Sequence, residues 1–126
     1  MRDELQLNIE PMDAKHDEFL VLLKEIKASS DSEFLALFES MIEHTKEHFS
    51  FEEEIMDTHN FYDKKEHFDE HENLLNEMQY FYEKAKKMKM FGRSYINDYA
   101  YEKFKRHVTN IDSQLAMFIK QNEIKL

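Results

Sequence analysis

The sequence contains no cysteine, and it has one glycine and one proline among its 126 residues. Without cysteine, disulfides, thiolate metal sites and cysteine nucleophiles are all excluded. A single glycine and a single proline leave too few turn residues for a multi-stranded β fold. Glu, Lys, Leu and Met favour helices, so the composition predicts an all-α protein.

Positive charge is also scarce, since 17 Lys and Arg stand against 27 Asp and Glu, a formal net charge of -10. A surface of this sign repels phosphate backbones and anionic lipid heads, so neither nucleic acid nor membranes are expected partners. No apolar run approaches the roughly 18 residues of a membrane span. The N-terminal segment MRDELQLN has neither the basic region nor the apolar core of an export signal. We expect a single cytoplasmic domain over residues 1–126.

Apolar residues recur at helical spacing in four segments. The pattern predicts helices over about 13–28, 32–57, 62–89 and 94–121, after an extended arm over about 1–11. Asp13 is a suitable N-cap for the first helix, and Ser30 and Glu33 have the spacing of a capping box before the second. The third helix is expected to end before Gly92, and the connection that leads from it to the fourth helix looks long. Four amphipathic helices predict an antiparallel up-down-up-down four-helix bundle.

Polar residues interrupt the apolar stripe of every helix. His48 and Glu52 are four residues apart and therefore share one helix face, and His67 and His71 repeat this spacing. An ionised Glu on a buried stripe is costly unless paired, and no Lys or Arg occupies these faces. Histidines from four helices around two carboxylates meet this need by binding a metal such as iron. The candidate ligands are His16, His48, Glu52, His67, His71, His107 and Asp112, the last two on opposite flanks of the fourth stripe.

Seven ligands of this kind suit a pair of metal ions. Five imidazoles, two bridging carboxylates and a bridging oxide or hydroxide would leave about one position open on two octahedral ions. The surroundings are Phe, Leu, Ile and Val without an evident acid or base, so the open position suits a small apolar molecule such as dioxygen. Glu53 and Glu54 follow the bridging Glu52 and rotate away from the stripe, so both are expected to be exposed.

Together these motifs resemble the haemerythrin family, and its single-domain bacterial members most closely, over nearly the whole chain. The family signature is a His on the first helix, HxxxE on the second, HxxxH on the third and HxxxxD on the fourth. The matching segments here are MDAKHDEFL, HFSFEEEIM, HFDEHENLL and HVTNID. The resemblance implies two irons per chain, one held by His67, His71 and His107, the other by His16 and His48, with Glu52 and Asp112 as bridges. It also implies that dioxygen binds reversibly at the two-histidine iron.

Three positions depart from the family pattern. The family often has Trp and Leu four and three residues before the fourth-helix His, where this chain has Lys103 and Phe104. Phe104 is expected to narrow the oxygen pocket, and Lys103 is expected to admit water and speed oxidation of the iron. His44 lies one turn before His48, where the family often has an aromatic residue, which suggests a supporting or proton-relay role.

Two classes of function remain open. The first is a non-enzymatic oxygen binder for storage, buffering or delivery, favoured by a complete ligand set and nothing else in the pocket. The second is a di-iron redox enzyme, or a sensor of oxygen or nitric oxide that acts through an unidentified redox or signalling partner; Lys103 and His44 favour it. Ferritin-like di-iron bundles use paired Glu-x-x-His motifs, which this sequence lacks. A third possibility, a bundle that binds no metal, would leave seven buried polar groups to be explained in another way.

Overall fold

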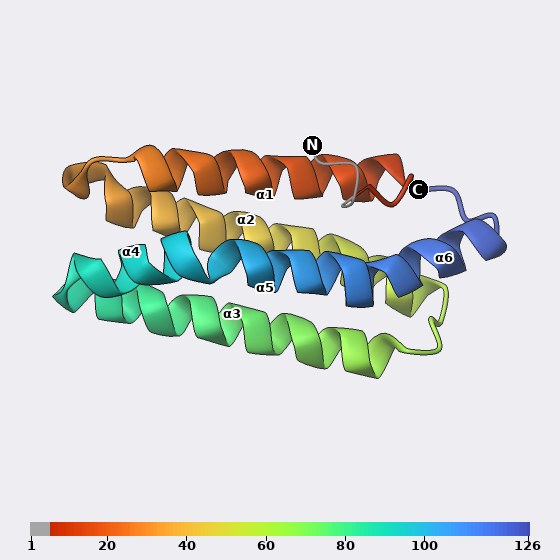
Figure 1. The fold of residues 1–126 in the computed structure, drawn as a ribbon. Helices are drawn as coiled ribbons and strands as arrows, with labels where there is room; N and C mark the ends of the chain where they lie inside the picture. The colour runs from red at the N-terminus through yellow and green to blue at the C-terminus, as the bar shows by residue number, and fades with distance from the viewer. Residues whose placement is uncertain (1–5) are drawn as a thin grey trace.

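A computed structural model describes residues 6–126, and all of the regular secondary structure in that range is helical (Figure 1). The elements are α1 (Glu10–Ala28), α2 (Asp31–Thr58), α3 (Lys64–Lys87), α4 (Lys89–Asp98), α5 (Ala100–His107), the π-helix η2 (Val108–Asp112) and α6 (Ser113–Gln121). None of the helices within residues 6–126 is long and apolar enough to cross a membrane. Residues 1–5 of the predicted arm lie outside the described range.

The helices form four antiparallel rods, because α4, α5, η2 and α6 follow one another along a single direction (Figure 1). Helices that are adjacent in the sequence pack against each other, and α4 also packs against α1. This last contact closes the bundle around a common interior. The predicted up-down-up-down four-helix bundle is confirmed.

The first helix begins earlier than the sequence predicted. It starts at Glu10, so Pro11 lies in the first turn, where its missing N–H has no helical partner to lose. Asp13 therefore does not cap this helix as its first residue. Its carboxylate instead accepts hydrogen bonds from the backbone N–H groups of Leu7 (2.9 Å) and Asn8 (3.0 Å). Asp13 thus fixes the turn that leads into α1.

The corner between α3 and α4 also differs from the prediction. Met88 is the single residue between the two helices, so the expected long connection before a fourth helix starting near residue 94 is wrong. Gly92 does not end a helix but is buried within α4. A Cβ atom at this position would lie 2.5 Å from Ala85 Cβ and 2.8 Å from Phe34 Cε2. The glycine therefore permits a close approach of three helices.

Two apolar clusters fill the interior and leave a polar layer between them. The first joins residues from the second half of α1, the first half of α2, the second half of α3, and α4 and α5. The second joins residues from the opposite ends of these rods, including Met12, Met56, Phe61 and Leu115. Along the first three rods the predicted ligands fall between residues of the two clusters, as His16 does between Met12 and Phe19. On the fourth rod, His107 precedes Val108, the last residue of the first cluster, and Asp112 lies between Val108 and Leu115 of the second. The fold therefore brings the ligands to one level of the bundle.

Candidate metal centre

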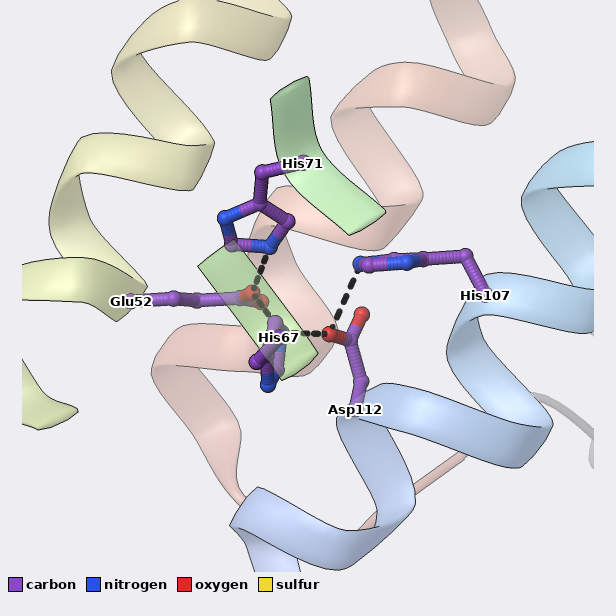
Figure 2. Close-up of side chains that lie close together, drawn as sticks. All are labelled: Glu52, His67, His71, His107 and Asp112. Atoms are coloured by element: carbon purple, nitrogen blue, oxygen red, sulfur yellow. Dashed lines mark hydrogen bonds and ion pairs between the residues drawn. The ribbon is translucent and has the colours of Figure 1, made fainter. Parts of the chain in front are cut away.

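All seven predicted ligands are buried at this level, each with at most 3% of its surface exposed. They come from all four rods: His16 from α1, His48 and Glu52 from α2, His67 and His71 from α3, His107 from α5 and Asp112 from η2. Their ligand atoms form two groups in which all atoms lie within 4.8 Å of one another. The three-histidine group contains Glu52, His67, His71, His107 and Asp112 (Figure 2). The two-histidine group contains His16, His48, Glu52 and Asp112, so both carboxylates belong to both groups.

Glu52 divides its two carboxylate oxygens between the groups. Its Oε1 lies 3.2 Å from His67 Nε2 and 3.1 Å from His71 Nε2, both on α3. Its Oε2 lies 2.7 Å from His48 Nε2 and 3.9 Å from His16 Nε2. One carboxylate is therefore shared between the two sides of the layer.

Asp112 divides its oxygens in the same manner. Its Oδ1 lies 3.0 Å from His67 Nε2 and 3.0 Å from His107 Nε2 (Figure 2). Its Oδ2 lies 2.9 Å from His16 Nε2, on the other side. All five imidazoles thus present Nε2 to a carboxylate oxygen, as side chains around a shared pair of cations do.

The π-helix η2 is what places Asp112 beside His107. The two residues are five apart, and in an α-helix residues five apart point about 140° away from each other. A π-helix has a wider turn, with hydrogen bonds from residue i to i+5, so residues five apart lie one above the other. The segment Val108–Asp112 is such a turn. It converts two residues on opposite flanks of the predicted stripe into neighbours within one site.

The local sequence supplies hydrogen-bond donors to the carbonyls around this wide turn. Thr109 Oγ1 donates to the Lys105 carbonyl (2.9 Å), and Ser113 Oγ donates to the Thr109 carbonyl (2.7 Å). Gln114 Nε2 donates to the Asn110 carbonyl (3.1 Å). Side-chain donors of this kind supplement backbone hydrogen bonds where the helical ladder is irregular. They favour the π-helix in a rod that is otherwise α-helical.

The contact between His107 and Asp112 tests whether a metal fits. His107 Nε2 and Asp112 Oδ1 are buried, and neither forms a hydrogen bond within the described residues, although they are 3.0 Å apart. Burying two polar atoms without hydrogen bonds costs free energy of folding unless a further group lies between them and interacts with both. Ligand atoms about 2.1 Å from one ion and at right angles to each other are about 3.0 Å apart. The residues present therefore fit a metal ion.

Without metal, the carboxylates and imidazoles of the site shift each other's pKa values. Burial and the charge of Asp112 raise the pKa of Glu52, but His48 and His67 outweigh them and hold this pKa well below its usual range. Burial raises the pKa of Asp112, and His107 outweighs that effect in the same way. Burial lowers the pKa of His107, but the Asp112 carboxylate raises it to about 10. Protons and metal ions therefore compete for the same imidazoles.

Two further carboxylates support the three-histidine group from outside, and the sequence did not reveal either. His71 Nδ1 donates a hydrogen bond to Glu53 Oε2 (2.8 Å), and Glu70 Oε1 lies 3.9 Å from His107 Nδ1, a contact that lowers the pKa of Glu70. The predicted exposure of Glu53 is wrong, because its side chain is only 33% exposed and turns toward α3; Glu54 is exposed as expected. A carboxylate that accepts a hydrogen bond from the outer nitrogen of a ligating imidazole, as Glu53 does from His71, fixes the tautomer and orientation of that imidazole. His107 Nδ1 has no hydrogen-bond partner among the described residues. Neither contact follows from helical spacing, because Glu53 and His71 lie on different helices, as do Glu70 and His107.

An apolar cavity of about 20 Å³ adjoins His48 and His107. This volume is enough for one molecule of about the size of water. The remaining wall residues are Phe19, Thr45, Phe49, Leu74, Met78, Tyr95, Ala100, Lys103 and Phe104. Phe104 stacks on Phe19 with ring centroids 4.3 Å apart and meets the edge of the His16 ring at 5.5 Å. A small apolar space thus lies directly beside the polar layer.

The departures from the family pattern occupy different places. Lys103 and Phe104 both line this cavity, as expected of residues that bear on its size and access. His44 belongs to neither ligand group. It is half-buried beside α1, where its Nε2 lies 3.5 Å from Glu18 Oε2. The contact with Glu18 places His44 at the surface between α1 and α2 and not among the ligand groups.

Fold and site together define an antiparallel helical bundle with a buried histidine and carboxylate cluster shared among its four rods. The comparison with known proteins agrees: the chain is 28% identical to the bacteriohemerythrin of Ralstonia nicotianae over 120 residues, which cover 94% of this chain and 87% of that protein. The chain is therefore a bacteriohemerythrin homologue, and the resemblance to the haemerythrins is confirmed. No protein-family model matches the chain, and no solved structure matches it.

Proposed function

We propose that this chain holds two iron ions in the candidate metal centre and binds dioxygen reversibly, for storage, buffering or delivery. The observation that carries the proposal is the division of the Glu52 and Asp112 oxygens between the two groups. Bridging carboxylates between a three-histidine and a two-histidine side suit a pair of ions of unequal coordination. The ligands would be His67, His71 and His107 on one side, His16 and His48 on the other, and Glu52 and Asp112 between them, with a bridging oxide or hydroxide.

The cavity supports dioxygen as the ligand. It adjoins His48 of the two-histidine group and His107 of the three-histidine group, has a mostly apolar wall, and has room for about one small molecule. When bound, an iron pair supplies the redox chemistry needed to take up and release dioxygen. The chain's own residues would exclude water through the apolar wall, and Glu53 would orient His71.

Repeated exposure of the reduced protein to air tests the proposal. The chain would be loaded with iron, reduced without oxygen, and followed by visible absorption as air is admitted and removed through several cycles. We expect two irons per chain by elemental analysis and a coloured adduct that forms and disappears in every cycle. Failure to bind two irons would refute the site itself.

A second candidate is a redox enzyme or sensor built on the same centre. Lys103 is the observation that favours it, because a cationic side chain in the cavity wall offers a route for water and protons. Under this alternative, air would convert the reduced protein quickly and irreversibly to its oxidised spectrum. The same experiment therefore separates the two candidates.

A further inference from the structure

The wall of the cavity beside the candidate metal centre is partly exposed at one edge. Nine of its eleven wall residues are buried, and the two that are partly exposed are Leu74 of α3 and Lys103 of α5. An entrance for small molecules is therefore expected where α3 and α5 lie side by side. The side chains that cross this seam decide what passes.

An ion pair crosses the seam at this point. Lys103 Nζ donates a hydrogen bond to Glu77 Oε2 at 2.8 Å, and Glu77 lies three residues after Leu74 on the same face of α3. The Lys103 side chain is 37% exposed and that of Glu77 is 29% exposed. The lysine stem thus forms part of the cavity wall while its charged end is held at the surface.

The second oxygen of Glu77 favours water when the pair is open. Glu77 Oε1 is buried and forms no hydrogen bond with any group in residues 6–126. A carboxylate oxygen in this position gains most from a water molecule. If Lys103 moves away, the seam has both the space and the acceptor to admit water beside the cavity.

We propose that the Lys103–Glu77 ion pair is a salt-sensitive latch over the entrance of the apolar cavity, and that it excludes water when closed. The inference rests on the proposed function for the identity of its ligand, dioxygen. The entrance itself depends only on the wall residues and is measurable with an inert apolar probe. Since both partners are partly exposed, dissolved salt weakens their attraction and increases the time that the latch is open.

Xenon exchange, followed by NMR on the purified full-length chain, tests the latch without relying on iron or dioxygen. We expect the exchange rate to rise about two- to fivefold between low and high salt, the range set by a partly exposed ion pair. In Glu77→Gln the exchange should be fast at every salt concentration. The matched control Glu83→Gln removes a Lys86–Glu83 pair of 3.2 Å on the same helix, away from the cavity wall, and should behave as wild type.

The variant Lys103→Met distinguishes a latch from an ion pair that only stabilises the fold. Methionine keeps an apolar stem over the entrance but has no charge, so exchange should be slow and independent of salt. Two variants that break one ion pair would then have opposite effects. Wild-type exchange that does not change with salt, or Glu77→Gln exchange at the wild-type rate, would overturn the latch. Xenon exchange as expected in a chain that binds no dioxygen would support the latch and refute the proposed function.

Discussion

The three-histidine and two-histidine groups share two carboxylates but differ in what surrounds them. On the three-histidine side, His71 is held from outside by Glu53 at 2.8 Å and by Phe49, whose ring is parallel to it at 3.8 Å. On the two-histidine side, the Phe104 ring packs against His16, whose Nδ1 has no hydrogen-bond partner among the described residues. His67 Nδ1 and His107 Nδ1, on the three-histidine side, also lack a partner among those residues. The two groups therefore differ in one hydrogen bond, from His71 to Glu53 on the three-histidine side, and in the Phe104 ring that packs against His16 on the other side.

If the two groups bind iron as proposed, the contact between Glu53 and His71 bears on how tightly the metal is held. Carboxylates outside an imidazole fix its orientation and increase its basicity, which favours tight and permanent metal binding. The small apolar cavity adjoins one histidine of each group, His48 and His107, and leaves room for a small ligand beside both. The two groups differ in their number of histidines and in these individual contacts, and both differences can be tested experimentally.

Removal of the metal should have the largest effect, because it affects both sides. Seven buried polar groups would lose their common partner, and a ligand present at about a thousand times its dissociation constant stabilises a fold by about 4 kcal/mol. We expect urea unfolding of the chelated protein to show a loss of roughly this size, and ferrous iron should restore the stability. Identical unfolding midpoints with and without iron would indicate a bundle that needs no metal.

The two sides should respond unequally when each loses one histidine. His71→Ala leaves two histidines and two carboxylates, which is the donor set of the intact two-histidine group. His16→Ala leaves a single histidine on its side. After saturation with iron and desalting, we expect elemental analysis to give about two irons per chain for His71→Ala and about one for His16→Ala. Equal losses would contradict the proposed division of the ligands.

Substitution of two neighbouring glutamates, Glu53 and Glu54, tests whether the hydrogen bond to His71 strengthens iron binding. Glu53→Ala removes the hydrogen-bond acceptor of His71 and should weaken iron binding about 10- to 100-fold, the usual effect of such a loss. Glu54→Ala changes an exposed residue on the same turn and is the matched control. Competition with a chelator of known affinity measures both. Equal affinities would mean that Glu53 is only a surface residue.

The sequence predicted those parts of the molecule that depend on regular helical spacing. His48 with Glu52, and His67 with His71, are four residues apart, so each pair shares a face in any α-helix that forms there. The bundle followed from four apolar stripes for the same reason. The assignment of irons to these residues rests on the family resemblance and stays a proposal.

The remaining features depend on irregular backbone or on contacts between helices. The five-residue spacing of His107 and Asp112 requires a π-helix, which an α-helical period does not reveal. From the sequence, Gly92 was expected to follow the end of a helix, yet a glycine is needed there because Ala85 and Phe34 approach its backbone closely. Glu53 and Lys103 have partners on other helices, so their contacts become visible only once the helices are packed.

The apolar wall is expected to give the smallest effect. Phe104→Leu removes the stacking on Phe19 and leaves extra space beside His16, which should cost about 1 kcal/mol of unfolding free energy. Both irons should remain bound because no ligand is changed, while xenon binding should strengthen in the larger cavity. Phe34→Leu is the matched control, since Phe34 is fully buried and packs edge-on against Phe38 at 5.8 Å, and neither of these residues lines the cavity. It should cost similar stability and leave xenon binding unchanged; equal xenon binding in both variants would place the ligand cavity elsewhere.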